Sequence, residues 1–209
     1  MEDEPHLSRR DRRHRDTREE ILGVARELLF EVGPEALSLR QVARRADFSP
    51  AALYNYFSSR DEIIASLFTE SFVKLNTYLE RVPVDLPLKK RVVELGMAYL
   101  DFGRENPMDL RCVLVATSQE GLSSTDAMAP GLNALRIIGD AVREGIEQGL
   151  FAPELSLSAA ELAYGVWALV HGLVSVSSVD VSLVADVLSA DSRRVLEAFV
   201  SLLIPTRPE

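Results

Sequence analysis

Hydrophobic residues recur along the chain at intervals of three and four, the spacing that places side chains on one face of an α-helix. The first such stripe lies within residues 21–32, and the last lies within residues 195–203. Alternation of the kind that predicts β-strands does not extend beyond a few residues anywhere in the 209-residue sequence. The pattern therefore predicts an all-α protein.

Four helix starts fall within about 45 residues near the beginning of the chain, each marked by a capping pattern. A Thr or Ser followed three residues later by Glu or Gln begins the helices predicted at Thr17, Ser38 and Ser59. Ser49 followed by Pro50 begins the remaining one, because proline lacks the N–H that a first helical turn leaves unpaired. Two short helices joined by a tight turn and preceded by a longer helix are typical of a helix-turn-helix.

The second short helix, predicted over residues 49–57, carries an unusual outer face. Leu53 and Phe57 are expected to be its buried residues. The outer face then holds small residues, an amide and phenols in place of Lys and Glu: Pro50, Ala51, Tyr54, Asn55 and, at one edge, Tyr56. Small residues let a helix lie deep in a major groove, an Asn can pair with adenine, and Tyr hydroxyls reach phosphates. This face favours contact with DNA.

Charge is distributed unevenly along the chain. The formal net charge is −9, yet residues 1–60 hold 11 Arg and 11 acidic side chains, so the whole deficit lies in residues 61–209. The segment 9–18 is locally basic. A basic head on an acidic body suits a protein that meets phosphates at one end, whereas a charge run taken alone is more typical of a solvated tail.

With these residues in view, the stretch from Thr17 to Ile64 resembles the DNA-binding head of the TetR family of bacterial repressors. The resemblance rests on residues 38–46 and 49–62, above all on the run Leu-Tyr-Asn-Tyr-Phe. It departs at Asp47, where the family usually has Gly and where left-handed backbone is needed, and at a position that is often basic but is Pro50 here. The resemblance implies an all-α protein with a three-helix DNA-binding head followed by a larger helical ligand-binding and dimerisation domain.

The resemblance also implies roles for individual residues. Arg40 and Ala51 match positions that approach bases, whereas Tyr54, Tyr56 and Arg60 match positions that contact phosphates. The arginines before Thr17 match basic arms that some members lay along the minor groove. The expected DNA-binding residues are Ser38, Arg40, Ser49, Pro50, Ala51, Tyr54, Asn55, Tyr56 and Arg60.

Farther along, the segment 164–172 resembles the Trp-x-x-x-His-Gly signature of one TetR C-terminal subgroup. Trp167 and His171 are four residues apart and so share a helix face. One interpretation is a ligand pocket, with the following lining: Tyr99, Phe102, Met128, Asn133, Trp167 and His171. The alternative is a packed aromatic beside a histidine whose hydrogen bond is made to a backbone carbonyl or to a neighbouring subunit.

The uncharged stretch 162–179 contains His171 and several serines, and a membrane-spanning helix needs about 20 mostly apolar residues. We therefore interpret it as a buried helix of a soluble protein. The family pairs its late helices into a four-helix interface, so the resemblance implies a homodimer through about 158–177 and 191–204. The expected organisation is a flexible basic arm over 1–16, the helix-turn-helix domain over 17–62, and the ligand-binding and dimerisation domain over 63–209.

The sequence contains none of the motifs that would indicate an enzyme, a metal-binding protein or an exported protein. It has neither a Gly-rich phosphate loop nor a Gly-x-Ser-x-Gly motif, so we expect no enzyme and no cofactor. Three histidines, two of them within the first 14 residues, and one cysteine give no metal-ligand spacing. Cys112 cannot form an internal disulfide and the first 18 residues lack an apolar signal core, so we expect a cytoplasmic protein without a membrane partner.

These observations predict a ligand-responsive transcriptional repressor. It would bind a palindromic double-stranded DNA operator as a homodimer and be released by a small-molecule effector in the C-terminal core. Two alternatives remain open at this point: a transcriptional activator of the same fold, and a protein–protein adaptor that uses the head to bind an acidic partner without DNA.

Overall fold

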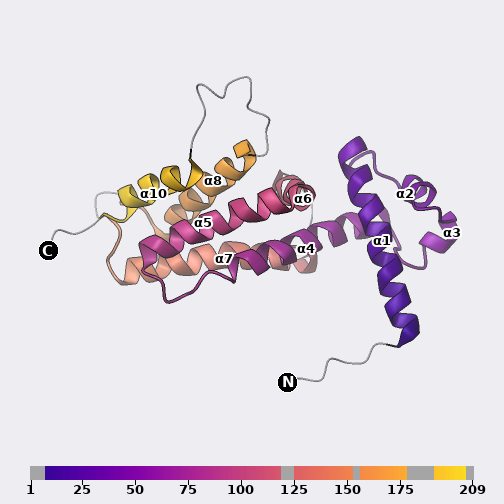
Figure 1. Cartoon of the computed structure of the whole chain (residues 1–209), viewed down its shortest axis with the longest axis horizontal. Helices are drawn as coiled ribbons and strands as arrows, with labels where there is room; N and C mark the ends of the chain where they lie inside the picture. The colour runs from indigo at the N-terminus through magenta and orange to yellow at the C-terminus, as the bar shows by residue number, and fades with distance from the viewer. Residues whose placement is uncertain (1–7, 119–124, 153–155, 178–190, 206–209) are drawn as a thin grey trace. The chain divides into compact units, whose positions relative to one another are not determined.

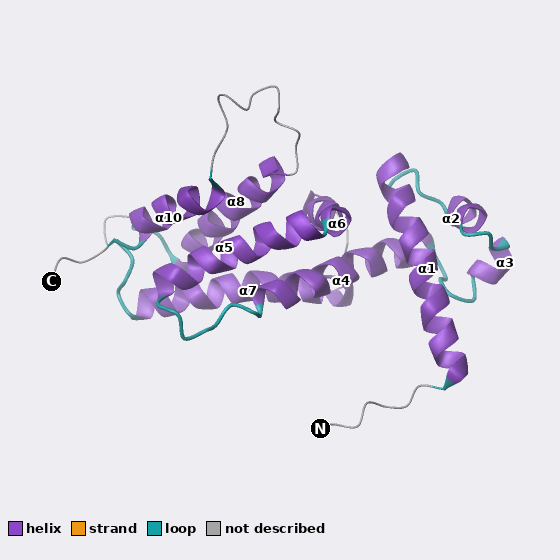
Figure 2. Ribbon diagram, viewed as in Figure 1, coloured by secondary structure: helices purple, strands orange, loops and turns teal. Residues whose placement is uncertain are grey.

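The computed structural model describes residues 8–118, 125–152, 156–177 and 191–205, and within these ranges it contains α-helices and no β-strand (Figures 1 and 2). The all-α prediction is confirmed. The chain divides into two compact units, residues 1–68 and 69–209. The helices are α1 (Arg9–Val32), α2 (Leu39–Arg45), α3 (Pro50–Leu53), α4 (Arg60–Leu79), α5 (Leu88–Glu105), α6 (Pro107–Ser118), α7 (Thr125–Glu147), α8 (Ala159–Ser177) and α10 (Ser192–Leu203).

In the first unit, α1, α2, α3 and the start of α4 enclose a hydrophobic core. Three of the predicted helix starts carry the expected caps: the hydroxyls of Ser38, Ser49 and Ser59 accept hydrogen bonds from backbone N–H groups three residues later, at 3.3, 3.1 and 3.1 Å. Side chains from all four helices and from the turn after α3 are almost completely buried: Ile21, Leu22, Leu29, Val42, Leu53, Phe57, Ile63 and Leu67. The local signals therefore place this core correctly.

The first helix begins earlier than the sequence predicts. Ser8, not Thr17, is its cap, because the Ser8 hydroxyl accepts the N–H of Asp11 at 3.2 Å. The expected helix start at Thr17 is wrong, and residues 9–16, expected as a flexible arm, form the first turns of α1. Arginine is a good helix former, so the Arg-rich segment extends the helix once a cap precedes it. Residues 1–7 of the expected arm lie outside the described residues.

The third helix is shorter than expected. It spans Pro50–Leu53, and the chain then continues through a tight turn to Phe57 instead of remaining helical. In this turn Asn55 and Tyr56 donate their N–H groups to carbonyls three residues back, at 3.1 and 2.9 Å. Such bonds tighten a helix end, and Asn and Tyr are weaker helix formers than Ala or Leu. Leu53 and Phe57 are nevertheless both buried as predicted.

The turn between α2 and α3 places Asp47 in the left-handed region, at φ 59°. Such a conformation costs an L-residue roughly 1–2 kcal/mol, and Asp tolerates it better than most. We expect Asp47→Gly to stabilise the protein by about 0.5 kcal/mol, because relief of the strain exceeds the added backbone entropy of the unfolded chain. Urea denaturation at fixed protein concentration measures this. Asp47→Ala, which keeps the Cβ atom, should not stabilise, and a Gly variant less stable than the wild type would contradict the argument.

In the second unit, α5 is the central helix, since it contacts α6, α7, α8 and α10. Ion pairs fasten two of these neighbours to it. Arg91 of α5 donates to the Glu144 carboxylate of α7, and Arg193 of α10 donates to both Glu94 oxygens at 2.8 and 3.1 Å. Gly96 lets α10 approach closely, because a Cβ atom there would lie 2.9 Å from a methyl group of Leu196.

Helix α8 is exposed along one side. Its stretch Ala159–Val176 is, among the described helices, the one long and apolar enough to cross a membrane by length and composition, a test that core helices of soluble proteins also pass. Val166, Val170 and Val174 face the core. The opposite side is exposed: Tyr164, Gly165, Ala168, Gly172 and Val176. The expectation of a buried helix therefore holds for one face only in the single chain, whose other face of α8 is exposed.

Candidate DNA-binding surface and ligand pocket

The outer face predicted for the third helix is exposed. Pro50, Ala51, Tyr54 and Asn55 all lie at the surface of the first unit. The side chains of Tyr54 and Asn55 make no hydrogen bond to any residue that the structure describes. A protruding small-residue face with an uncommitted amide and phenol can enter a groove and form new hydrogen bonds there without first breaking old ones.

The arginines near this face differ in whether their guanidinium groups already form ion pairs. Arg40, in the first turn of α2, is exposed and forms no ion pair with a described residue. Arg45, at the end of the same helix, donates to both oxygens of Glu31 at 3.1 and 2.6 Å, a hydrogen-bonded pair that lowers the pKa of the Glu31 carboxyl. Arg60 lies between these cases, since it pairs with Asp61 at 2.8 Å while its side chain stays partly exposed.

The hydroxyls of the capping serines are already in use. Ser38 both accepts the N–H of Gln41 and donates to the Gln41 side-chain oxygen at 2.6 Å, and Ser49 accepts from Ala52. These two residues can therefore hold their helix starts in place, leaving the remaining first-turn N–H groups to face a phosphate.

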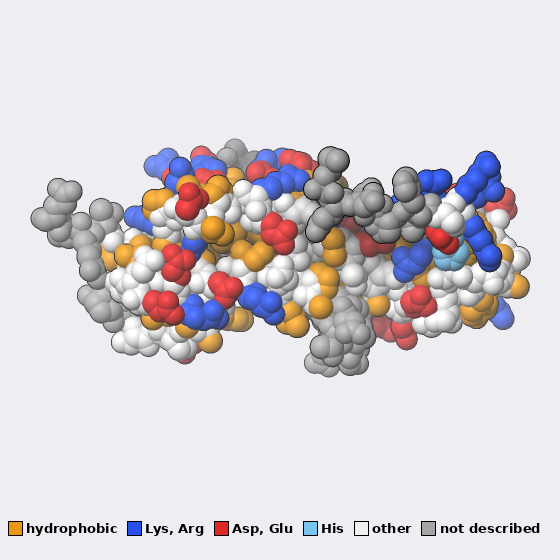
Figure 3. Space-filling model, turned by 90° about the horizontal axis from the view of Figure 1, so that it is seen from below, with side chains coloured by type: hydrophobic (Ala, Val, Ile, Leu, Met, Phe, Trp, Pro, Cys, Tyr) orange, Lys and Arg blue, Asp and Glu red, His pale blue; other side chains and the backbone are white. Residues whose placement is uncertain are grey.

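Tyr56 is packed against α1 rather than standing free on the outer face. Its ring stacks on His14, with centroids 4.7 Å apart and planes 26° apart, and meets the edge of Phe48 at 6.0 Å. One turn farther along α1, the Arg18 guanidinium lies 4.6 Å from the centroid of the Phe57 ring. The early part of α1 therefore supports the segment that follows α3. In the space-filling view, basic side chains of the first unit, which are all arginines, gather beside a histidine (Figure 3).

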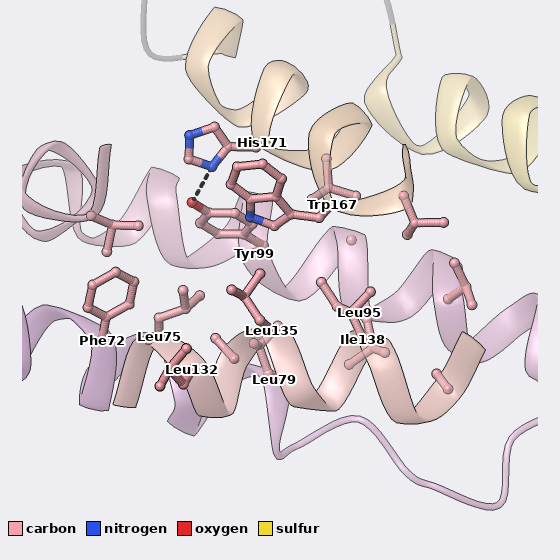
Figure 4. Close-up of a pocket in the computed structure, with 18 residues that line it drawn as sticks. Phe72, Leu75, Leu79, Leu95, Tyr99, Leu132, Leu135, Ile138, Trp167 and His171 are labelled. Carbon is pink, nitrogen blue, oxygen red and sulfur yellow. Dashed lines mark hydrogen bonds between the residues drawn. The ribbon is translucent and has the colours of Figure 1, made fainter. Parts of the chain in front are cut away.

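In the second unit, α4, α5, α6, α7 and α8 enclose a cavity of about 90 Å³ (Figure 4). Its walls are almost entirely hydrocarbon. The lining consists of Phe72, Leu75, Leu79, Val92, Leu95, Gly96, Tyr99, Val113, Gly131, Leu132, Ala134, Leu135, Ile138, Ala141, Val166, Trp167, Val170 and His171.

Polar groups meet at one end of this pocket. The Tyr99 hydroxyl and His171 Nδ1 are 3.2 Å apart and share one hydrogen bond, and the Trp167 ring lies 4.9 Å from the His171 ring (Figure 4). Burial raises the pKa of the Tyr99 phenol and lowers the pKa of the His171 imidazole. Both shifts favour the neutral forms near pH 7.

The structure brings together only part of the predicted pocket set. Tyr99, Trp167 and His171 lie in the lining, whereas Phe102 is fully buried behind Tyr99 and Asn133 of α7 is half-buried outside the lining. The side chain of Met128 lies outside the described residues. Sequence reasoning missed the α4 and α7 contributions, which read as ordinary helical core stripes: Phe72, Leu75, Leu79, Leu132, Leu135 and Ile138. Across the described ranges, no three His, Cys, Asp or Glu residues gather into a metal site.

The first unit is a helix-turn-helix that exposes Pro50, Ala51, Tyr54 and Asn55, and the second unit is helical and contains an apolar pocket. Together these features define the class of DNA-binding transcriptional regulators. Residues 21–67 match the family described as bacterial regulatory proteins, tetR family, and residues 92–203 match the tetracyclin repressor-like C-terminal domain. The chain belongs to the TetR family of transcriptional regulators.

Named relatives agree with this assignment. The chain is 28% identical over 147 residues to the HTH-type transcriptional regulator Rv1816 of Mycobacterium tuberculosis, a match that covers 66% of this chain and 62% of that protein. A tetR family regulator structure from Shewanella sp. PV-4 is 17% identical, with a TM-score of 0.69 over 88% of this chain and 95% of that one. The structure of AibR with isovaleryl coenzyme A and operator DNA is 15% identical, with a TM-score of 0.71 over 91% and 100%. These structures show the fold. Because the family and its named members are regulators, the expectation that the chain is not an enzyme is confirmed.

Proposed function

We propose that this regulator is a repressor that binds a palindromic operator as a homodimer and is released by a small-molecule effector held in its second unit. The observation that carries the DNA-binding part is the exposed face of Pro50, Ala51, Tyr54 and Asn55, whose polar groups are uncommitted. The related structure of AibR contains operator DNA and isovaleryl coenzyme A, which supports pairing these two activities in one fold.

On this proposal, α3 enters the major groove and the surrounding side chains hold the backbone. Ala51 and Asn55 face the bases, and Arg40 reaches them from α2. Tyr54, Tyr56 and Arg60 contact phosphates, with Tyr56 held at a fixed angle by His14. Arg10 lies one turn before His14 on the same face of α1, so the helical start of α1 carries a positive charge next to the Tyr56 contact.

The homodimer is proposed to form through α8 and α10. Both helices pack on α5, which leaves their opposite faces uncovered (Figure 1). The uncovered face of α8 has the small residues Gly165, Ala168 and Gly172, flanked by Tyr164 and Val176. That of α10 carries Phe199 and Leu202. Small residues permit close helix contact, and large exposed apolar side chains are typical of interfaces.

An effector that prefers one arrangement of the second unit would change the spacing of the two heads. DNA and effector would then oppose each other through thermodynamic linkage. An electrophoretic shift on a selected operator, with and without effector, tests the proposal. Failure of the purified protein to shift any selected duplex would favour the adaptor alternative. Activation of transcription from an operator placed upstream of a promoter would favour an activator. We propose the cytoplasm as the site of action, where operator DNA is accessible.

Arg40→Ala is expected to weaken operator binding by about 1–3 kcal/mol and to relax the preference for one base pair in each half-site, because a cation that contacts a base edge is lost. Arg45→Ala is the matched control on the same helix, since its guanidinium is already held by Glu31, and it should keep the wild-type preference. Fluorescence anisotropy with labelled operators that differ at single base pairs provides both values. An unchanged preference at every base pair in Arg40→Ala would contradict the assignment of Arg40 to a base.

A further inference from the structure

The pocket in the second unit is notable for what its walls lack. Among the residues that the structure describes, 18 line the pocket, and none of these is Asp, Glu, Lys or Arg. We propose that this pocket binds a small, uncharged, apolar molecule about the size of one ring. The molecule carries a single hydrogen-bonding group, which lies against Tyr99 and His171. This inference rests on the proposed role of the pocket as the effector site.

The absence of charge from the lining determines the charge of the ligand. An ionised carboxylate, phosphate or ammonium group inside the pocket would lose its hydration and find no opposite charge on the walls. Burying an unpaired charge in apolar surroundings is far more costly than burying a neutral polar group. A charged molecule can therefore occupy this pocket only if its charge stays outside.

The polar pair determines the kind of head group. Tyr99 and His171 point toward each other at one end of the cavity, while leucine and phenylalanine side chains surround the other end (Figure 4). The phenol and the neutral imidazole share one hydrogen bond, which leaves the pair with further capacity to donate or accept one. An alcohol, phenol or ketone oxygen matches that capacity.

The cavity volume limits the size of the ligand. An apolar cavity of roughly 150 Å³ holds benzene, and the cavity here measures about 90 Å³. A larger molecule needs a side chain of the wall to move, and on the α7 side Leu132 and Leu135 line the pocket and are also partly exposed to solvent, so either can swing outward. Near Gly131 the space is closed, because a Cβ atom there would lie 3.2 Å from the Phe72 ring. A single ring that displaces Leu135 outward fits this shape.

The chain supplies its own reporter, since Trp167 is its one tryptophan and lies in the pocket wall. We would titrate the full-length protein with benzyl alcohol, benzoate and benzylammonium, which share a ring and differ in charge, and follow Trp167 fluorescence. Benzyl alcohol is expected to bind at least 10-fold more tightly than either ion. Equal binding of benzoate or benzylammonium, or no response to benzyl alcohol, would overturn the proposal.

A charge placed in the pocket wall should reverse this preference. Leu135→Lys adds an ammonium group at a residue that is 46% exposed, so its aliphatic stem can follow the wall while the charge keeps contact with water. Benzoate binding is expected to rise at least 5-fold. Leu157→Lys is the matched control, because Leu157 is 45% exposed and lies outside the pocket. An equal gain in both variants, or none in Leu135→Lys, would overturn the assignment to this pocket.

Removing both members of the polar pair tests the anchor. In the double variant Tyr99→Phe, His171→Leu, neither group can replace the other, and benzyl alcohol is expected to bind 3- to 10-fold more weakly. Toluene, which lacks the hydroxyl, should change by less than 2-fold. Equal losses for both ligands would assign the pair to pocket shape alone and overturn its role as an anchor. These assays contain no DNA, so a protein that binds benzyl alcohol but shifts no operator would contradict only the proposed repressor function.

Discussion

Replacing Phe199 and Leu202 together by Glu is expected to leave a monomer that binds a palindromic operator at least 100-fold more weakly than the wild type. These side chains are 49% and 71% exposed on α10, on the face that does not pack against α5. Four carboxylates brought together in an apolar interface would lose hydration and repel one another. A monomer contacts one half-site at a time and loses the gain from simultaneous binding of two. Sedimentation equilibrium and electrophoretic shift measure the two effects.

The matched control places a glutamate on an exposed apolar residue away from α8 and α10. Val84, in the connection between α4 and α5, is 80% exposed, and Val84→Glu should keep both the dimer and the operator affinity. Far-ultraviolet circular dichroism should give the same helix content for all three proteins. A double variant that remains a dimer would place the interface elsewhere, and a monomer with wild-type affinity for the palindrome would remove the need for a dimer.

The sequence predicted those features of the fold that depend on residues close together in the chain. The caps at Ser38, Ser49 and Ser59 each involve a hydroxyl and an N–H three residues away. The burial of Leu53 and Phe57 follows from helical spacing, whereas the left-handed backbone at Asp47 was implied by the resemblance to a family that usually has Gly there. Such features need no knowledge of distant partners, which is why periodicity and capping identify them.

The early start of α1 has a local signal that the predicted start at Thr17 overlooked, since the Ser8 hydroxyl accepts the N–H of Asp11 three residues later. The composition of the pocket, in contrast, depends on contacts between residues far apart in the sequence. The pocket needs five helices to define which apolar side chains face an opening and which face each other. Tyr99 and Phe102 lie on neighbouring positions of the same α5 stripe, yet only Tyr99 reaches the pocket. Periodicity identifies the hydrophobic stripe of α5, but it does not show which of its residues line the pocket and which pack in the core.

Phe102→Ala is expected to lower the free energy of unfolding by about 3–5 kcal/mol, because a large side chain is removed from a filled part of the core. Phe102 is 0% exposed, and its ring meets those of Tyr78 and Tyr99 at centroid distances of 5.6 and 6.2 Å. A domain is typically stable by about 5–15 kcal/mol, so this loss is a large part of the total. Urea denaturation measures it, with protein concentration held constant because dimerisation would contribute to stability.

Phe102→Leu separates burial from a role in ligand binding. Leucine keeps most of the hydrocarbon, so the loss of stability should be less than about 1.5 kcal/mol, and benzyl alcohol should bind as it does to the wild type because Phe102 does not line the cavity. If Phe102 instead contacted the ligand, its truncation would weaken ligand binding. The free energy of unfolding would then change little, because a side chain in a pocket wall already borders empty space. A loss below 1 kcal/mol for Phe102→Ala together with weakened benzyl alcohol binding would therefore return Phe102 to the pocket and contradict the packing described for α5.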